Sequence, residues 1–373
     1  MTALFWLSLT LIGYTYFGYP IYLWLRVRLQ DRAASQKNVS RPHPLPTVSV
    51  VIAAHNEEAN LQAKIQNLML TEYPKESLQI VIASDGSTDR SAAILYEHSS
   101  KILPVILEHC NGKAYALNEA VKRAIGEIIV FQDARQLVDS NAILELVSCL
   151  ADQNVGAVSG ELLLESTSSA SAEGLGIYWR IEKAVRKLES ASGSTVGVTG
   201  ALYAVRRALY VEIPAGTILD DVFVPMRVVK AGKRVVFQSS AIARDRLFVQ
   251  KGKEFSRKVR TLTGNYQLLR LEPWLFSTKN PLLFRFFCHK LLRLAVPLFL
   301  ATMLIASVSA KGAFYRAAFL VQVAFYIVAA LGAAKPSTKT FKPVAIAHTF
   351  VMLNAAAALA FYSFVVGRKR IWV

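Results

Sequence analysis

Hydrophobic positions gather at the two ends of the chain. Residues 1–25 contain no Asp, Glu, Lys or Arg, and Arg26, Arg28 and Arg32 follow them. A run of this length predicts a membrane-spanning helix rather than a buried helix of a soluble domain, and it lacks the basic start of a cleaved signal. Its basic flank predicts that the next part of the chain stays in the cytoplasm.

Near the other end stand more uncharged runs. They are Leu294–Ala310, Ala317–Ala334 and Pro343–Gly367. We therefore expect about three further spans within residues 294–367. Four spans in total would leave both termini outside, whereas Arg368, Lys369 and Arg370 favour the inside. The sequence leaves open whether one segment fails to cross.

A region of ordinary polarity, residues 46–275, lies between these ends. In its first half, apolar strands alternate with helical stretches, and the strands are expected at residues 48–55, 79–85, 102–109 and 127–134. This alternation is typical of βαβ units and predicts an α/β domain with a mostly parallel sheet covered on both faces. Polar residues follow the strands at one rim, where open α/β sheets bind ligands. A later helix, at residues 172–190, is expected to pack against the domain.

The composition agrees with a division into membrane and polar parts. Of 373 residues, 53% are hydrophobic, and the formal net charge is +17. Such a charge suits an anionic membrane surface or a phosphate-bearing substrate. Nucleic acid is disfavoured, because the basic residues flank membrane segments and no recognition motif is present. Three cysteines without metal-ligand spacing indicate a reducing compartment rather than a disulfide scaffold.

A basic, aromatic stretch precedes the second apolar region. Residues 251–293 hold ten Lys or Arg against two Asp or Glu, with Trp and Phe between them. Such a stretch is typical of interfacial helices on an anionic leaflet. We therefore expect the cytoplasmic domain, residues 46–275, to be followed by an interfacial segment that extends to residue 293.

Two motifs at strand ends offer chemistry. In ASDGSTDRS (83–91), Asp85 ends a strand before Gly86, and it either belongs to a capped turn or hydrogen-bonds a base or ribose. In NGKAYALNEAV (111–121), Lys113 begins a helix, where backbone N–H groups and an ammonium suit a diphosphate; a solvated lysine is the alternative. No G-x-G-x-x-G follows the first strand and no Walker loop is present, which argues against dinucleotides and P-loop ATP hydrolysis.

The motifs stand in an order that resembles a known family. The resemblance rests on VSVVIAAHNEEANL, IVIASDGSTDRS, NGKAYALNEAV, IIVFQDARQ, VTGALYAVRR and ILDDVFVPMRVVKAGKRV. Over about residues 48–265 they resemble family-2 glycosyltransferases of the GT-A fold. The attached membrane segments are similar to those of cellulose and hyaluronan synthases. The resemblance implies a GT-A nucleotide-sugar-binding domain between N- and C-terminal transmembrane helices.

This resemblance implies roles for the strand ends in donor binding. The nucleotide is expected to contact Ala54, His55, Glu57 and Asp85. Lys113 would lie near the diphosphate. Asp133 matches the first residue of the family's Asp-x-Asp, which helps hold the sugar nucleotide and a divalent metal, Mg²⁺ or Mn²⁺.

Arg135 occupies the second acidic position of that motif, and a guanidinium cannot ligate a metal. In one interpretation Asp133, helped by phosphates and waters, still recruits the metal, and Arg135 only adjusts the site. In the other, Arg135 pairs with phosphate and replaces part of the metal's charge. We favour the first, because magnesium often accepts one or two carboxylates together with substrate phosphates.

ILDD (218–221) matches the family's acidic pair at the start of a helix. Through that resemblance, Asp221 is expected to deprotonate the acceptor hydroxyl, with Asp220 beside it; a plain helix cap is the alternative. Gly200, in VTGALYAVRR, would let the acceptor approach closely because it has no side chain.

SRKVRTLTGN (256–265) departs from the Gln-x-x-Arg-Trp of processive synthases. Arg260 matches the arginine that neutralises the departing diphosphate, and Arg257 takes the glutamine position at the donor site. Thr261 replaces the tryptophan whose ring helps form the acceptor site in such enzymes. The resemblance therefore supports glycosyl transfer better than processive polymerisation.

We expect an integral protein of a bacterial inner membrane whose cytoplasmic domain transfers a sugar with inversion. The donor would be a nucleotide sugar, uridine-linked by the resemblance, and the acceptor lipid-linked or a polysaccharide of the cell surface. Processive synthesis with export is one alternative. A catalytically inactive membrane partner of a polysaccharide machine is another, and the presence of both Asp133 and Asp221 argues against it. Membrane lipids and proteins of such a machine are the expected partners.

Overall fold

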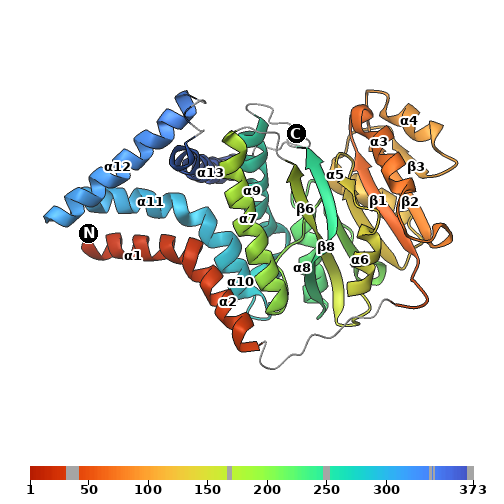
Figure 1. Cartoon of the computed structure of the whole chain (residues 1–373), viewed down its shortest axis with the longest axis horizontal. Coiled ribbons are helices and arrows are strands. Elements are labelled where there is room, and N and C mark those ends of the chain that lie inside the picture. Colours follow the sequence, from red (N-terminus) through yellow and green to blue (C-terminus); the bar gives the residue numbers. More distant parts are fainter. Residues whose placement is uncertain (31–41, 166–169, 247–252, 336–337, 339–340, 368–373) are drawn as a thin grey trace.

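The computed structural model describes residues 1–30, 42–165, 170–246, 253–335, 338 and 341–367. It contains an α/β domain and a group of long helices, which lie at opposite sides of the view in Figure 1. The N-terminal helix lies beside one of the C-terminal helices in this group. Both apolar ends of the sequence therefore meet on one side of the domain.

Eight strands of the described chain form one mixed sheet, in the order β3-β2-β1-β4-β7-β6-β8-β5. Their bounds are β1 Val48–Ala54, β2 Leu78–Asp85, β3 Leu103–Leu107, β4 Ile128–Asp133, β5 Leu137–Val138, β6 Val155–Glu165, β7 Leu202–Arg206 and β8 Arg234–Arg246. β3, β2, β1 and β4 run parallel, and so do β6 and β8; β7 is antiparallel to both of its neighbours and β5 to β8. The predicted α/β class is confirmed, with antiparallel strands added to the parallel ones.

Helices cover both faces of the sheet, as the strand–helix alternation predicts. They are α3 Glu58–Met69, α4 Ser91–Glu97, α5 Lys113–Lys122, α6 Ala142–Cys149 and α8 Asp220–Lys230, with 3₁₀ turns at Lys75–Ser77, Arg207–Leu209 and Pro273–Phe276. Successive residues of β1 enter different cores: Val51 packs with α5 and α8, and Ile52 with α3 and α6. Because both faces are buried, the register of the strands is fixed, and with it the residues that reach their carboxyl ends.

The helical group contains the apolar ends of the sequence. Its elements are α1 Thr2–Gly13, a π-helical turn Tyr14–Gly18, α2 Tyr19–Gln30, α10 Leu283–Phe286, a π-helical turn Phe287–Leu291, α11 Leu292–Ser309, α12 Ala313–Ala334 and α13 Lys342–Val365. Among the described residues, those long and apolar enough to cross a membrane are Leu283–Ser309, Ala313–Ala334 and Lys342–Val365. The predicted first span, residues 1–25, is divided by a π-helical turn, and its crossing stays a prediction.

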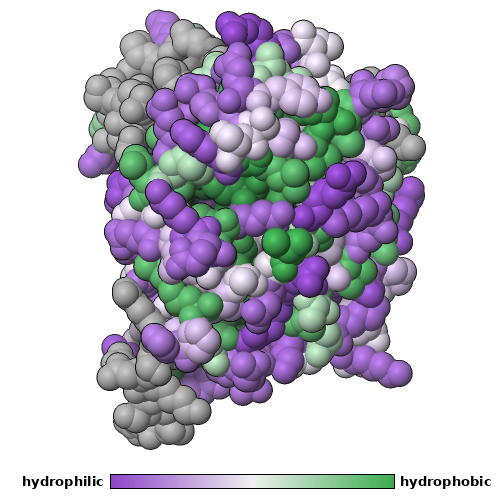
Figure 2. All heavy atoms as spheres, turned by 90° about the vertical axis from the view of Figure 1, so that its right-hand side faces the viewer, coloured by the Kyte–Doolittle hydropathy of each residue, from purple (hydrophilic) through white to green (hydrophobic). Residues whose placement is uncertain are grey.

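Two long helices, α7 Ala170–Ala191 and α9 Lys253–Leu271, stand between the sheet and the helical group (Figure 1). α7 contacts β8 on one side and α2 on the other, and α13 packs against both α7 and α9. The predicted packing of the helix at 172–190 against the domain is thereby confirmed. The opposite end of the domain faces the viewer in Figure 2, and mostly hydrophilic side chains cover it.

A buried polar network joins the helical group to α7. The hydroxyl of Tyr19 donates to Glu189 Oε1 at 2.5 Å, and His289 Nδ1 lies 2.9 Å from the same oxygen. The Arg285 guanidinium donates to the carbonyl oxygens of Glu189 at 2.5 Å and Ser192 at 2.6 Å. Buried polar groups are tolerated only when they are paired, so this network fixes how α2, α7 and α10 meet.

Candidate active site

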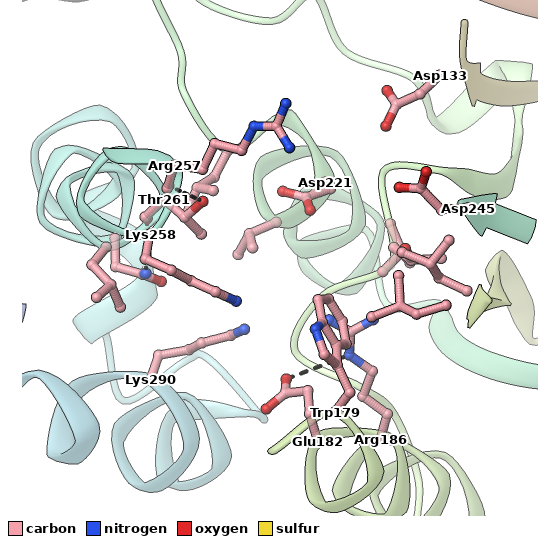
Figure 3. A pocket seen from close by; sticks show the side chains of 18 of the residues that line it. Asp133, Trp179, Glu182, Arg186, Asp221, Asp245, Arg257, Lys258, Thr261 and Lys290 are labelled. Atoms are coloured by element: carbon pink, nitrogen blue, oxygen red, sulfur yellow. Dashed lines mark hydrogen bonds and ion pairs between the residues drawn. The ribbon is translucent and has the colours of Figure 1, made fainter. Parts of the chain in front are cut away.

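The carboxyl ends of β1, β2 and β4 lie side by side at one edge of the sheet, as predicted. Ala53 pairs with Asp133 of β4, and Ala54 pairs with Ser84 of β2. A cavity of about 450 Å³ opens beside Asp133 and is lined by residues of β4, β8, α7, α8 and α9 (Figure 3). Chemistry-bearing residues from distant parts of the sequence therefore converge there.

Asp85 shapes the loop that leads to Lys113. It is fully buried, and its two carboxylate oxygens accept the backbone N–H groups of Asn111 at 2.9 Å and Gly112 at 2.7 Å. Gly86 has φ +57°, and a Cβ there would meet the backbone of Cys110 at 2.3 Å, so only glycine fits this turn. These bonds tie Asp85 to the loop at residues 111–112 rather than to a capped turn, and its contact with a base or ribose stays a prediction.

Asp85 also belongs to a small group with metal-binding atom types. Ligand atoms of His55, Asp85 and Cys110 lie within 4.8 Å of one another. His55 Nδ1 lies 2.7 Å from the carbonyl oxygen of Asp85, and N–H groups occupy both Asp85 carboxylate oxygens. We assign this group to holding the loops together rather than to a cation.

The other predicted nucleotide contacts lie at the same rim. Ala54 is fully buried at the end of β1. Glu57 accepts the side-chain amide of Asn60 at 2.6 Å, and its backbone N–H donates to Ser91 Oγ at 2.9 Å. These residues set the turn between β1 and α3, so the structure gives them a local role and leaves their donor contacts as predictions.

Lys113 lies between two carboxylates, those of Asp133 and Asp220. Its ammonium lies 2.9 Å from Asp133 Oδ1 and 3.4 Å from Asp220 Oδ2. Burial alone would lower the pKa of Lys113, but the carboxylates of Asp133 and Asp220 outweigh it and raise the pKa above its usual value. The lysine therefore stays charged and holds together the two motifs that the sequence assigned to donor binding and to base catalysis.

Asp220 and Asp221 begin α8, where the helix dipole favours carboxylates. Burial and the neighbouring Asp220 raise the pKa of Asp221 to about 6, although Lys113 acts in the opposite sense. An added Cβ on Gly200 would lie 3.7 Å from both Asp221 Oδ2 and Lys113 Nζ. A side chain at this position would lie in the space between Asp221 and Lys113, and the role of Gly200 in acceptor approach stays a prediction.

Arg260 reaches the same cluster from α9. Burial lowers the pKa of its guanidinium, against the raising effect of Asp220, Asp221 and Asp133. Its Nε is buried and finds no hydrogen-bond partner among the described residues. A buried donor without a partner beside three carboxylates is suited to an incoming anionic group.

Arg135 is paired with Asp245, a carboxylate that the sequence motifs did not predict as part of the site. Its guanidinium donates to Asp245 Oδ2 of β8 at 2.5 Å, and Gln136 Nε2 donates to the same oxygen at 3.0 Å. Asp245 is 6% exposed and lines the cavity together with Asp133 (Figure 3). Asp245 balances the charge of Arg135, which weakens the interpretation that this arginine replaces a metal.

Two further residues of the sequence motif, Arg257 and Thr261, line the cavity from α9. Arg257 is exposed, and its carbonyl oxygen accepts the hydroxyl of Thr261 at 3.0 Å. An aromatic side chain does enter the cavity, but from α7: Trp179, whose ring lies 5.0 Å from Lys258 Nζ. The loss of the family tryptophan at Thr261 therefore does not leave the cavity without an aromatic wall.

A mixed α/β sheet with carboxylates and cations at its strand ends, opening beside an acidic pair on a helix, has the architecture of the GT-A fold. Residues 49–212 match Glycosyl transferase family 2. The matched residues lie in the α/β domain, to which long apolar helices are attached.

Two curated relatives are bacterial polymer synthases. Poly-beta-1,6-N-acetyl-D-glucosamine synthase of Staphylococcus aureus (strain COL) is 24% identical over 236 residues, 60% of this chain and 56% of the relative. That of Staphylococcus epidermidis is 25% identical over 236 residues, 61% of this chain and 56% of the relative. This chain thus spans about half the length of the curated relatives it matches.

A solved structure resembles the whole fold. The mannosyltransferase PcManGT from Pyrobaculum calidifontis, in complex with GDP-Man and Mn²⁺, is 24% identical with a TM-score of 0.74. The match covers 98% of this chain and 100% of that one. The likeness includes the helical group as well as the sheet, and it confirms the GT-A fold.

Proposed function

We propose that this protein transfers a sugar from a nucleotide sugar to an acceptor hydroxyl at the membrane surface, with inversion in a single displacement. The observation that carries the proposal is the contact of Lys113 with both Asp133 and Asp220, which brings the donor motif and the acidic pair to one cavity. The relatives and the solved neighbour, all named for sugar transfer or glycan synthesis, support it.

Asp221 supplies the base. Its carboxyl, with a pKa of about 6, is ionised at neutral pH and yet more basic than an ordinary aspartate. The acceptor hydroxyl would approach over Gly200 and lose its proton to Asp221. The acceptor oxygen then attacks the anomeric carbon opposite the nucleotide, so the configuration inverts.

The leaving diphosphate needs positive charge. Lys113 and Arg260 face three carboxylates, so the protein's own groups leave the centre negative before the donor binds. A divalent cation fits this need, and hard carboxylate oxygens of Asp133 would hold it, with Asp245 as a second carboxylate at the cavity wall. When bound, the cation would neutralise charge that develops on the diphosphate. The Mn²⁺ of the solved neighbour supports a divalent metal.

Donor and acceptor identity are open to a direct test. The relatives are named for a polymer of N-acetylglucosamine, which favours a uridine-linked donor, whereas the solved neighbour carries GDP-Man. We expect membranes that contain the protein to turn over one donor from a panel of nucleotide sugars, with a single sugar added to a lipid-linked acceptor. Mass spectrometry of the product gives the answer; long chains from purified protein would favour processive synthesis instead.

The role of Asp221 has its own test. Asp221→Asn should retain nucleotide binding and lose turnover by roughly 10²–10⁴-fold, the usual effect of general base catalysis. Asp139→Asn, on the domain surface where Asp139 pairs with Arg244, is a matched control and should keep turnover within about twofold. Turnover of Asp221→Asn at the native rate would remove this aspartate from the mechanism.

A further inference from the structure

A fully buried lysine contacts the bend that follows Asp133 and joins β4 to β5, residues 134–136. Lys64 belongs to α3, where Leu61 and Leu68 on the same helix face pack into the core, and none of its surface is exposed. Its ammonium donates to the carbonyl oxygen of Gln136 at 2.6 Å. The chemistry described above does not use this group, and Lys64 does not line the cavity.

An ammonium at this position costs stability. Burial lowers the pKa of Lys64 to about 7, against the raising effect of Asp133. Moving a charge out of water is expensive even when it is hydrogen-bonded, and an apolar side chain of similar volume would fill the same space in the core at lower cost. Packing of the core therefore does not account for a lysine here, whereas its contact with the β4–β5 bend does.

Asn67, about one turn further along α3, holds the strand that follows the bend. Its side-chain amide donates to the carbonyl oxygen of Val138 at 2.8 Å, and its Oδ1 accepts the backbone N–H of Val138 at 2.9 Å. Residues three apart on a helix lie on one face, so Lys64 and Asn67 act from the same side of α3. Together they fix residues 136–138 to this helix at two points.

The side chains of the β4–β5 bend are held by β8. Arg135 and Gln136 both donate to Asp245 Oδ2, at 2.5 Å and 3.0 Å. Gln136 is thus fixed twice, through its backbone by Lys64 and through its side chain by Asp245. Asp133 immediately precedes the bend and lines the cavity together with Asp245 (Figure 3). The path of the bend therefore decides where the carboxylate of Asp133 stands.

We propose that Lys64 is a positioning residue for donor binding, which holds the β4–β5 bend through the carbonyl oxygen of Gln136 so that Asp133 faces the diphosphate of the nucleotide sugar and its divalent cation. The inference rests on the proposed function, because it takes Asp133 as a donor-binding carboxylate. Lys64 acts through the bend and does not touch the donor. A buried ammonium that costs stability is retained because a displacement of about 1 Å in such a site can lower activity by up to about 10²-fold.

Lys64→Met tests this proposal, because methionine has nearly the length of lysine and lacks the ammonium. With the full chain in detergent, titration calorimetry with UDP or GDP in the presence of Mn²⁺ identifies the nucleotide that the native protein binds. Lys64→Met should bind the same nucleotide about tenfold more weakly. The KM for the donor should rise by a similar factor while kcat falls by less than about threefold, because Asp221 is unchanged and Asp133 contacts the donor both before and during the reaction.

Thermal unfolding separates a role in orientation from a role in stability. Removal of the buried ammonium offsets the unpaired carbonyl oxygen of Gln136, so Lys64→Met should unfold within about 4 °C of the native protein. Leu68→Met is the matched control, since it makes a volume-conserving change at a fully buried residue on the same face of α3, and it should bind the nucleotide within about twofold of the native protein. Asn67→Ala, which releases Val138, should weaken binding about threefold and serves as a second variant.

Native-like nucleotide binding in Lys64→Met, or an equal loss in Leu68→Met, would overturn the proposal. So would a Lys64→Met protein that loses stability in step with binding, because Lys64 would then be a structural residue. If Lys64→Met is not recovered folded, Asn67→Ala decides, and native-like binding in this variant rejects the proposal. A native protein that binds neither UDP nor GDP would contradict the proposed donor site and this inference with it, whereas native binding that persists unchanged in both variants fails this inference alone.

Discussion

The pKa of Asp221 is raised to about 6 because the carboxyl is partly buried beside Asp220, and this predicts the pH profile of the enzyme. A base must be unprotonated, so kcat/KM should fall as the pH drops below about 6 and level off above it. Asp220→Asn removes the like charge, which should lower the pKa of Asp221 and move this limb down by up to about one pH unit. A pH–rate profile that is flat from pH 5 to 8, or a limb that stays in place in Asp220→Asn, would contradict this assignment.

Arg135 and Asp245 predict how the enzyme uses metal. Since Asp245 already pairs with the guanidinium, we expect that Arg135 does not stand in for a cation and that excess chelator abolishes native turnover. Arg135→Asp removes a positive charge and adds a carboxylate, so it should be tolerated while making turnover more steeply dependent on added Mn²⁺. A metal titration of both proteins checks this. Full native activity in chelator, together with inactive Arg135→Ala, would show that the arginine replaces the metal.

Local pattern made some residues of the site predictable and left others hidden. Asp133 stands at the end of an apolar strand that the strand–helix alternation predicts, whereas Asp221, at the start of α8, was singled out by the resemblance of ILDD to the family's acidic pair. Asp245 lies 110 residues from Arg135, and Trp179 enters from α7, so their roles depend on tertiary contacts that no local period encodes. A signal was available in IARDR, where an acid stands between two arginines near a strand end.

At the scale of elements, the first four strands follow from their apolar runs, because each is joined to the next by a helix and β1, β2 and β4 are largely buried. The antiparallel strand β7 was not predicted, since its five residues lie inside a motif that also carries Gly200. β6 and β8 pair in parallel across about 80 residues of chain, so their partners could not be read from neighbouring sequence. The order and pairing of the strands in the second half of the sheet therefore could not be predicted from the sequence.

One buried hydrogen bond of the network, from Tyr19 to Glu189, joins α2 directly to α7. Tyr19→Phe removes the hydroxyl that donates to Glu189 and leaves that carboxylate with one donor fewer, which should cost about 1–3 kcal/mol of stability. Tyr22→Phe is a matched control on the same helix, because its hydroxyl accepts a bond from Arg26 at an exposed site. Thermal unfolding in detergent should show a drop of several degrees for Tyr19→Phe alone; equal midpoints would mean that the network does not fix this junction.

On the scale of the whole molecule, the arrangement of the helical group bears on how many segments cross the membrane. Four spans would leave the C-terminus outside, whereas the basic residues 368–370 favour the inside. In Figure 1, α1 and α11 lie side by side across the view, whereas α13 is seen nearly along its own axis. Helices that cross a bilayer run roughly along its normal, so we expect that α13 does not cross together with α1 and α11. It packs against α7 and α9 as well as against α11 and α12, and we expect it to lie at the cytoplasmic interface.

This arrangement predicts the topology. With α1–α2, α11 and α12 crossing, the catalytic domain and the C-terminus share the cytoplasm, which agrees with Arg26 and Arg28 after the first span and with the basic residues 368–370 at the other end. In a background carrying Cys110→Ser, Cys149→Ser and Cys288→Ser, single cysteines report the side of each segment. A membrane-impermeant maleimide should label Lys311→Cys in intact cells, because the turn between α11 and α12 is exposed and outside. Ser100→Cys on the domain and Val373→Cys should react only after permeabilisation. Labelling of Val373→Cys from outside would place α13 across the membrane, and labelling of Ser100→Cys from outside would reverse the orientation of the whole protein.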